Sequence, residues 1–182
     1  KILGKANKES VKFAANENYF KQSMDAIAND PWIKIADDYD LGLQAAKGHR
    51  EEAYAAADLA EKVPTVKRAE RAYSGGLSVL RADVWKSRLQ RYGDTPEEAA
   101  ERLGQKGLEG LAEVTMTLSG RGGKKGGWTA KHATSLQEAL FSPRLWASRL
   151  EPFNPAFWKR VGPAGRKEAF ESLGAFAAVA GS

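Results

Sequence analysis

The residues best suited to bind a ligand lie in a glycine-rich segment, SGRGGKKGGW, at residues 119–128. Five glycines in ten residues are incompatible with a regular helix or strand. Cationic side chains there could neutralise the phosphates of a nucleic acid, and a tryptophan could stack on a base. The candidate nucleic-acid contacts are Arg121, Lys124, Lys125, Trp128 and Lys131. The alternative interpretation is a solvent-exposed connector.

The same segment does not match a nucleotide-binding P-loop. That motif needs G-x-x-x-x-G-K followed by Ser or Thr, whose hydroxyl binds magnesium. Here Gly123 and Lys124 are followed by Lys125, and no strand is predicted before them. A P-loop nucleotide site is therefore excluded.

No combination of residues in the chain is typical of a catalytic or metal site. The sequence has no cysteine, and its two histidines, His49 and His132, are far apart. Asp37, Asp38 and Asp40 lack the spacing and the glycine of a calcium loop. We therefore expect no enzymatic activity, no cofactor and no bound metal.

Arginines and tryptophans form a second group of candidates, suited to structural contacts and interfaces. We expect the arginines to pair with carboxylates within or between subunits, and the tryptophans to anchor a core or an interface. The arginines are Arg71, Arg81, Arg144 and Arg149, and the tryptophans are Trp85, Trp146 and Trp158.

The composition predicts that all-α structure positions these residues. Ala, Leu, Glu, Lys and Arg dominate, and runs of Val, Ile and Thr are scarce. Proline and glycine divide the chain into a multi-helix array of short and medium helices, which we expect to be a segment of a longer protein. We predict an N-terminal helical region (1–118), a Gly/Lys-rich linker (119–133) and a C-terminal short-helix region (134–182).

Hydrophobic spacing predicts which helix faces are buried. Up to about Asp40, short helices should dock through a stripe of Phe13, Tyr19, Phe20, Met24 and Ile27. An alanine-rich helix should follow at 50–62. The strongest helix should run from 65 to about 92, with a stripe of Val66, Ala69, Tyr73, Leu77, Leu80, Val84 and Leu89. Gly75 and Gly76 should bend this helix or permit close approach of a neighbour.

Capping signals predict the remaining helices. Thr95 and Pro96 should start a helix that ends near Leu118, with Glu98 reaching back to Thr95. Glycines at 104, 107 and 110 predict a neighbouring helix crossing there. Asn154–Pro155 and Gly162–Pro163 should start two further helices, and the last should bury a face of Phe170, Leu173, Phe176 and Val179.

The apolar C-terminal residues and the uneven distribution of charge along the chain indicate which kinds of partner the chain could bind. Residues 173–181 are apolar, too short to span a membrane alone but a candidate for contact with a membrane. Residues 1–64 carry a net charge of −2 and residues 65–182 carry +7. The basic part is suited to phosphate, an acidic partner or a membrane surface, or is simply a solvated face.

Several ordered segments resemble a helical domain of the large polyvalent proteins of tailed bacteriophages. The resemblance covers about residues 50–182. The segments are REEAY at 50–54 with EKVP at 61–64, AERAY at 69–73 with LRADVW at 80–85, SGRG at 119–122, ALFSPR at 139–144 with ASR at 147–149, NP at 154–155, and RKEA at 166–169.

This resemblance implies a structural component of a phage virion, ejected from the capsid interior into the host envelope or cytoplasm with the genome. It implies homo-oligomers or contacts with other virion proteins, and it transfers no catalytic residue. The alternative function is a nucleic-acid-binding module that uses the basic glycine-rich loop on DNA.

Overall fold

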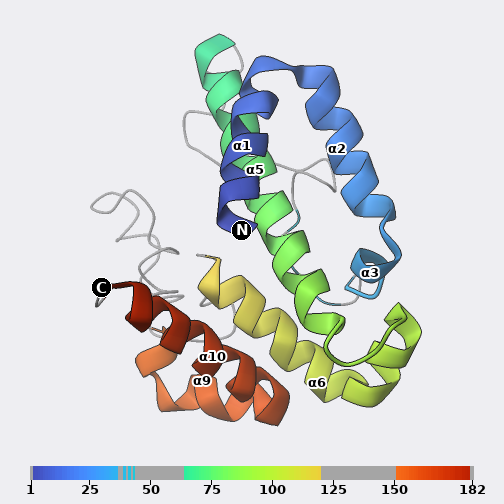
Figure 1. The fold of residues 1–182 in the computed structure, drawn as a ribbon, viewed down its shortest axis with the longest axis vertical. Helices are drawn as coiled ribbons and strands as arrows, with labels where there is room; N and C mark the ends of the chain where they lie inside the picture. Colours follow the sequence, from blue (N-terminus) through green and yellow to red (C-terminus); the bar gives the residue numbers. More distant parts are fainter. Residues whose placement is uncertain are drawn as a thin grey trace. The chain divides into compact units, whose positions relative to one another are not determined.

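The computed structural model describes residues 2–36, 39, 41, 43, 64–119 and 151–180, with the side chains of residue 3 and of 175–180 excepted. All regular elements in these ranges are helices, which confirms the all-α prediction (Figure 1). They are α1 (Ile2–Ala15), α2 (Glu17–Asn29), α3 (Pro31–Lys34), α5 (Pro64–Leu89), α6 (Pro96–Leu118), the 3₁₀ helix η1 (Glu151–Phe153), α9 (Pro155–Arg160) and α10 (Gly162–Ala180). The helix predicted at 50–62 lies outside the described residues.

The chain divides into two compact units, Lys1–Ser87 and Arg88–Ser182. The boundary falls within α5, whereas the sequence placed it at the linker 119–133, which lies outside the described residues except for Ser119. The physical reason is that α10 packs along α6, so that helices on either side of the linker share one unit.

The first unit is built around the docking stripe predicted for α1 and α2. Phe13 and Met24 are buried with Ala6 and Val79, and Phe20 packs edge to face on Phe13 with ring centroids 5.6 Å apart. Tyr19 and Ile27 also pack against this cluster. Asn16 caps α2, and Asp30 caps α3 ahead of Pro31. The stripe is therefore confirmed.

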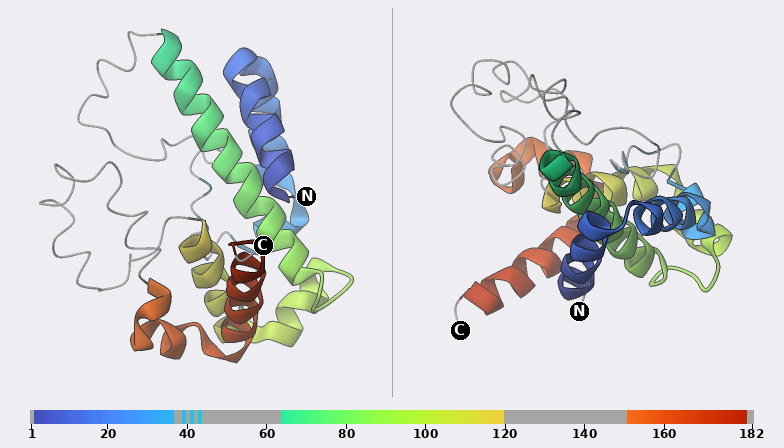
Figure 2. Two further views of the ribbon diagram at one scale, coloured as in Figure 1. Left: turned by 60° about the vertical axis from the view of Figure 1, so that its left-hand side comes forward. Right: turned by 90° about the horizontal axis from the view of Figure 1, so that it is seen from above.

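Gly75 and Gly76 allow α1 to lie close against α5 (Figure 2). A Cβ atom at Gly76 would lie 2.0 Å from Oγ of Ser10, and one at Gly75 would lie 2.5 Å from the ring of Phe13. Of the two roles predicted for this glycine pair, the structure shows close helix approach.

The stripe predicted for α5 is wrong over its first half. Val66 and Tyr73 are 41% and 52% exposed. The buried face instead carries Ser74, Ser78 and Arg81 at spacings of three and four, followed by Trp85. Small residues are needed on α5 where α1 approaches it, and hydrophobic spacing does not reveal such positions.

In the second unit, α6 starts as its capping signal predicts. Oγ1 of Thr95 accepts a hydrogen bond from the backbone N–H of Glu98 at 3.2 Å. The Glu98 carboxylate reaches back to the N–H of Asp94 at 2.9 Å, one residue before the predicted partner. Gly104 interrupts the helix with φ 60° and ψ 174°, a conformation that glycine tolerates best.

The predicted crossing over α6 is confirmed at one of the three glycines, Gly110. A Cβ atom there would lie 2.0 Å from the carbonyl oxygen of Val161, and one at Gly165 of α10 would lie 2.9 Å from the carbonyl oxygen of Gly110. A Cβ atom at Gly107 would lie nearest to Leu103 of its own helix, at 3.1 Å, and one at Gly104 would meet nothing within 4 Å.

The face predicted to be buried on α10 is also corrected. Phe170 is 64% exposed and Leu173 is half-buried, while the side chains of Phe176 and Val179 lie outside the described part of the chain. Ala169 is instead buried with the core of Val114, Phe157 and Val161, and Glu168 is buried as well. No helix in the described ranges is long and apolar enough to cross a membrane.

We predict that Gly110→Ala lowers the free energy of unfolding by about 1–3 kcal/mol, because its methyl group would collide with the Val161 backbone. Urea denaturation followed by circular dichroism measures the change. Gly174→Ala, in the same unit with no atom within 4 Å, should instead stabilise by up to about 1 kcal/mol. Equal effects of the two substitutions would contradict the close crossing.

Candidate functional site

Eight of the predicted site residues lie outside the described part of the chain. They are all five candidate nucleic-acid contacts, Arg121, Lys124, Lys125, Trp128 and Lys131, and three candidate interface residues, Arg144, Trp146 and Arg149. Of the four that are described, Arg71, Trp85 and Trp158 make contacts within their own unit, and Arg81 is buried.

Arg71 caps the C-terminal end of α1. Its guanidinium donates to the carbonyl oxygens of Phe13 and Ala14, each at 3.3 Å, and pairs with Glu17 at 3.3 Å. Carbonyl groups at a helix end lack partners within the helix, and a cation there also suits the helix dipole. Arg71 therefore stabilises the turn between α1 and α2.

Arg81 and Trp85 are part of the interior of the first unit. Arg81 is 1% exposed and Trp85 is 0% exposed. The indole N–H of Trp85 donates to the carbonyl oxygen of Trp32 at 2.8 Å, which ties α5 to α3. Neither side chain is available on the surface of this unit.

Trp158 of α9 lies at the edge of the second unit. Its indole N–H donates to the carbonyl oxygen of Pro152 at 2.8 Å. Its ring meets the buried Phe157 edge to face and stacks on Phe170 of α10, with centroids 4.5 Å apart. Trp158 thus connects the core to an exposed aromatic ring.

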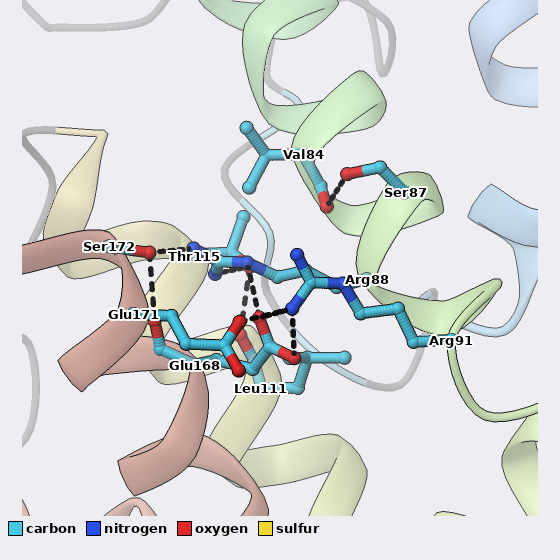
Figure 3. A network of polar contacts seen from close by, with 9 residues as sticks. All are labelled: Val84, Ser87, Arg88, Arg91, Leu111, Thr115, Glu168, Glu171 and Ser172. Carbon is cyan, nitrogen blue, oxygen red and sulfur yellow. Dashed lines mark hydrogen bonds and ion pairs between the residues drawn. The ribbon is translucent and has the colours of Figure 1, made fainter. Parts of the chain in front are cut away.

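The sequence did not predict a network of buried charges in the second unit, centred on Arg88 and Glu168 (Figure 3). Arg88 is 7% exposed and Glu168 is 2% exposed. Nε of Arg88 lies 3.4 Å from a carboxylate oxygen of Glu168. Burial lowers the pKa of Arg88, and the charge of Glu168 acts in the opposite direction.

Two hydroxyl groups complete the surroundings of Arg88. It donates to Oγ1 of Thr115 at 3.2 Å and to Oγ of Ser172 at 2.9 Å. Each hydroxyl donates its own proton to a carbonyl oxygen one turn earlier, Thr115 to Leu111 and Ser172 to Glu168, both at 2.8 Å. The lone pairs of both hydroxyls are therefore left to accept from the guanidinium.

Arg91 covers the outer side of the network. Its Nη1 donates to both carboxylate oxygens of Glu168, at 3.1 and 3.2 Å, and also to Glu171. The hydrogen bond to Glu171 and the charge of Glu168 raise the pKa of Arg91. Burial, followed by the charge of Glu168, raises the pKa of neighbouring Tyr92.

A second cluster in the same unit joins α6, η1 and α9 through Arg160. Arg160 donates to Glu113 at 2.8 Å and to the buried Glu151. Burial opposes the charge of Arg160, but its hydrogen bonds to Glu113 and Glu151 raise its pKa overall. Like the Arg88 network, this cluster consists of arginine held by carboxylates from other elements.

Both clusters are suited to holding helices together. Arginine keeps its proton under ordinary conditions, so neither guanidinium can serve as a proton donor in catalysis. Among the described residues, no group of three or more His, Cys, Asp or Glu side chains could hold a metal ion. No local signal could have revealed the networks, because Arg88 and Ser172 are 84 positions apart and Arg91 and Glu168 are 77 apart.

We predict that Glu168→Gln lowers the free energy of unfolding by about 3–5 kcal/mol, because it leaves the buried Arg88 without its counter-charge. Glu171→Gln, on the exposed side of the network, should cost at most about 1 kcal/mol. Glu101→Gln, on the exposed face of α6, is the control and should change stability by less than about 0.5 kcal/mol. Urea denaturation checks this order, and three equal effects would contradict it.

Comparison of the chain with protein-family models, with curated proteins and with solved structures finds no match. A functional proposal therefore rests on the residues of this chain and on their arrangement.

Proposed function

We propose that this chain is a structural, assembling segment of a tailed-bacteriophage virion protein. The protein would be carried inside the capsid and delivered with the genome into the host envelope or cytoplasm. The observation that carries the assembly role is an apolar stripe on the first half of α5, formed by Val66, Ala69 and Tyr73, which the first unit leaves exposed. We call it the α5 stripe.

The spacing of the α5 stripe suits a helix-to-helix contact. Its members are three and four residues apart, so they lie on one side of the helix. The row continues into Leu77, which is half-buried. A second copy of the chain, or another virion protein, could cover the stripe and gain the free energy of removing apolar surface from water.

The buried and half-buried ion pairs hold separate helices together, which supports a structural role. Arg88 with Glu168, and Arg160 with Glu113, connect elements that are distant in sequence. Without cysteine, the chain has no disulfide that would need to be broken before passage through a phage tail. The phage setting itself rests on the segment resemblance over residues 50–182.

We predict that light scattering will find a defined multimer of the chain in solution. Val66→Glu combined with Tyr73→Glu should lower the measured mass towards that of the monomer, because two carboxylates would be buried in the contact. Val11→Glu, at a 71% exposed apolar position of α1, is the matched control and should leave the mass unchanged. A multimer that is unaffected by the double substitution would exclude the α5 stripe.

The same measurement with a DNA duplex tests the alternative, a nucleic-acid-binding module. A monomer that binds the duplex, loses affinity steeply with salt and is disabled by alanine at Arg121, Lys124 and Lys125 would favour that function over assembly. A multimer that forms without DNA and is unchanged by it would favour assembly.

We also predict where the parent protein is found during infection. Mass spectrometry should detect peptides of this chain in purified virions and, after infection, in the envelope or cytoplasmic fraction of the host. Peptides that appear only late in infected cells, and never in virions, would contradict the ejection role.

A further inference from the structure

The outer face of Phe170 is an exposed aromatic surface on a fixed support. Trp158 stacks on one face of this ring, with an angle of 24° between the ring planes. A stacked neighbour keeps water from that face, yet 64% of Phe170 remains exposed. The opposite face of the ring is therefore open to a third planar group.

The support beneath Phe170 is held from three sides. The Trp158 indole donates to the carbonyl oxygen of Pro152, and its ring packs edge to face on Phe157, which is 1% exposed. The carbonyl oxygen of Trp158 accepts a hydrogen bond from Nε of Arg166 at 2.5 Å. An incoming ring would thus meet a pre-ordered stack, which lowers the entropic cost of binding.

The charges beside this stack are positive. Arg166 and Lys167 precede Phe170 by four and three residues, so both lie one helical turn from it on the same side of α10. The carboxylates next in sequence, Glu168 and Glu171, are held by Arg91. The surface around Phe170 therefore attracts anions.

These features suit a nucleic acid better than a lipid surface. A membrane-binding helix presents a row of large apolar side chains on one face. On this side of α10, Arg166 and Lys167 lie one turn before Phe170, and Gly174 and the half-buried Leu173 lie one turn after it. Among the side chains described on this side of α10, Phe170 is thus the one large apolar group that is exposed. One open aromatic ring beside two cations matches the stacking platform of proteins that bind single strands.

We propose that Phe170, backed by Trp158, stacks on an unpaired base of a single-stranded nucleic acid, and that Arg166 and Lys167 contact its phosphates. A base within a duplex is already stacked on its neighbours, so single strands should bind more tightly than duplexes. This site is separate in sequence from the basic loop at 121–131 and does not depend on the assembly role.

Fluorescence anisotropy of the full chain with a labelled oligothymidylate of about 15 nucleotides tests the proposal. Phe170→Ala and Phe170→Leu should raise Kd roughly 5- to 100-fold, because neither side chain offers a planar ring. Phe170→Tyr should stay within about twofold of the original. Arg166→Ala with Lys167→Ala should flatten the dependence of log Kd on log salt, by about 0.7 for each phosphate that is no longer neutralised.

Two controls separate this site from the basic loop and from apolar surface elsewhere on the chain. Val11→Ala, which removes exposed apolar surface in the first unit, should leave Kd unchanged. The loss of affinity on Phe170→Ala should persist when Arg121, Lys124 and Lys125 are alanine, and circular dichroism should show each variant folded. The proposal is overturned if the chain does not bind the oligonucleotide, if Phe170→Leu binds as well as Phe170→Tyr, or if Phe170→Ala weakens binding to phosphatidylglycerol vesicles but not to the oligonucleotide.

Discussion

The arrangement of the second unit depends on keeping the buried Arg88–Glu168 pair fully satisfied. Removing two charges from water costs several kcal/mol for each ion, and their attraction offsets this only when the remaining polar atoms are also bonded. Here Thr115, Ser172 and Arg91 supply those bonds. Because the participants come from α6, from α10 and from the segment that starts at Arg88, a shift of either helix would break several bonds at once. The network therefore specifies one arrangement of these helices more than it adds net stability.

The close crossing of α6 and α10 makes this network geometrically possible. The backbones meet at Gly110 and Gly165, where side chains would hold them apart. Thr115 lies just over one turn beyond Gly110, and Ser172 lies two turns beyond Gly165. Two short hydroxyl side chains can reach the same guanidinium only if the two helix axes come this close. Small residues and buried charges are thus two parts of one packing solution.

Local signals predicted the helices well, whereas the buried faces of those helices depend on non-local contacts and were predicted poorly. Three helix starts depend only on residues within one turn: the caps at Thr95 and Asn154 and the start of α10 at Gly162. Such local signals can be recognised in the sequence alone. The buried side of α5 depends on what approaches it: a glycine pair receives α1, and Arg88 meets partners from the far end of the chain. Hydrophobic spacing carries no information about either contact, and it therefore predicted wrongly that Tyr73 is buried. Both charge networks were missed for the same reason.

In both units some polar side chains are buried and some apolar side chains are exposed, and this has a consequence for function. Helix α5 turns Ser74, Ser78 and Arg81 inward and leaves Val66 and Tyr73 exposed, while α10 buries Glu168 and exposes Phe170. Exposed apolar side chains of this kind often mark surfaces that bind a partner. Exposed aliphatic and tyrosine side chains in a helical row suit another helix, whereas an open ring beside two cations suits a base. The two surfaces therefore follow from one feature of the sequence, the placement of small and charged residues where a core would ordinarily take leucine.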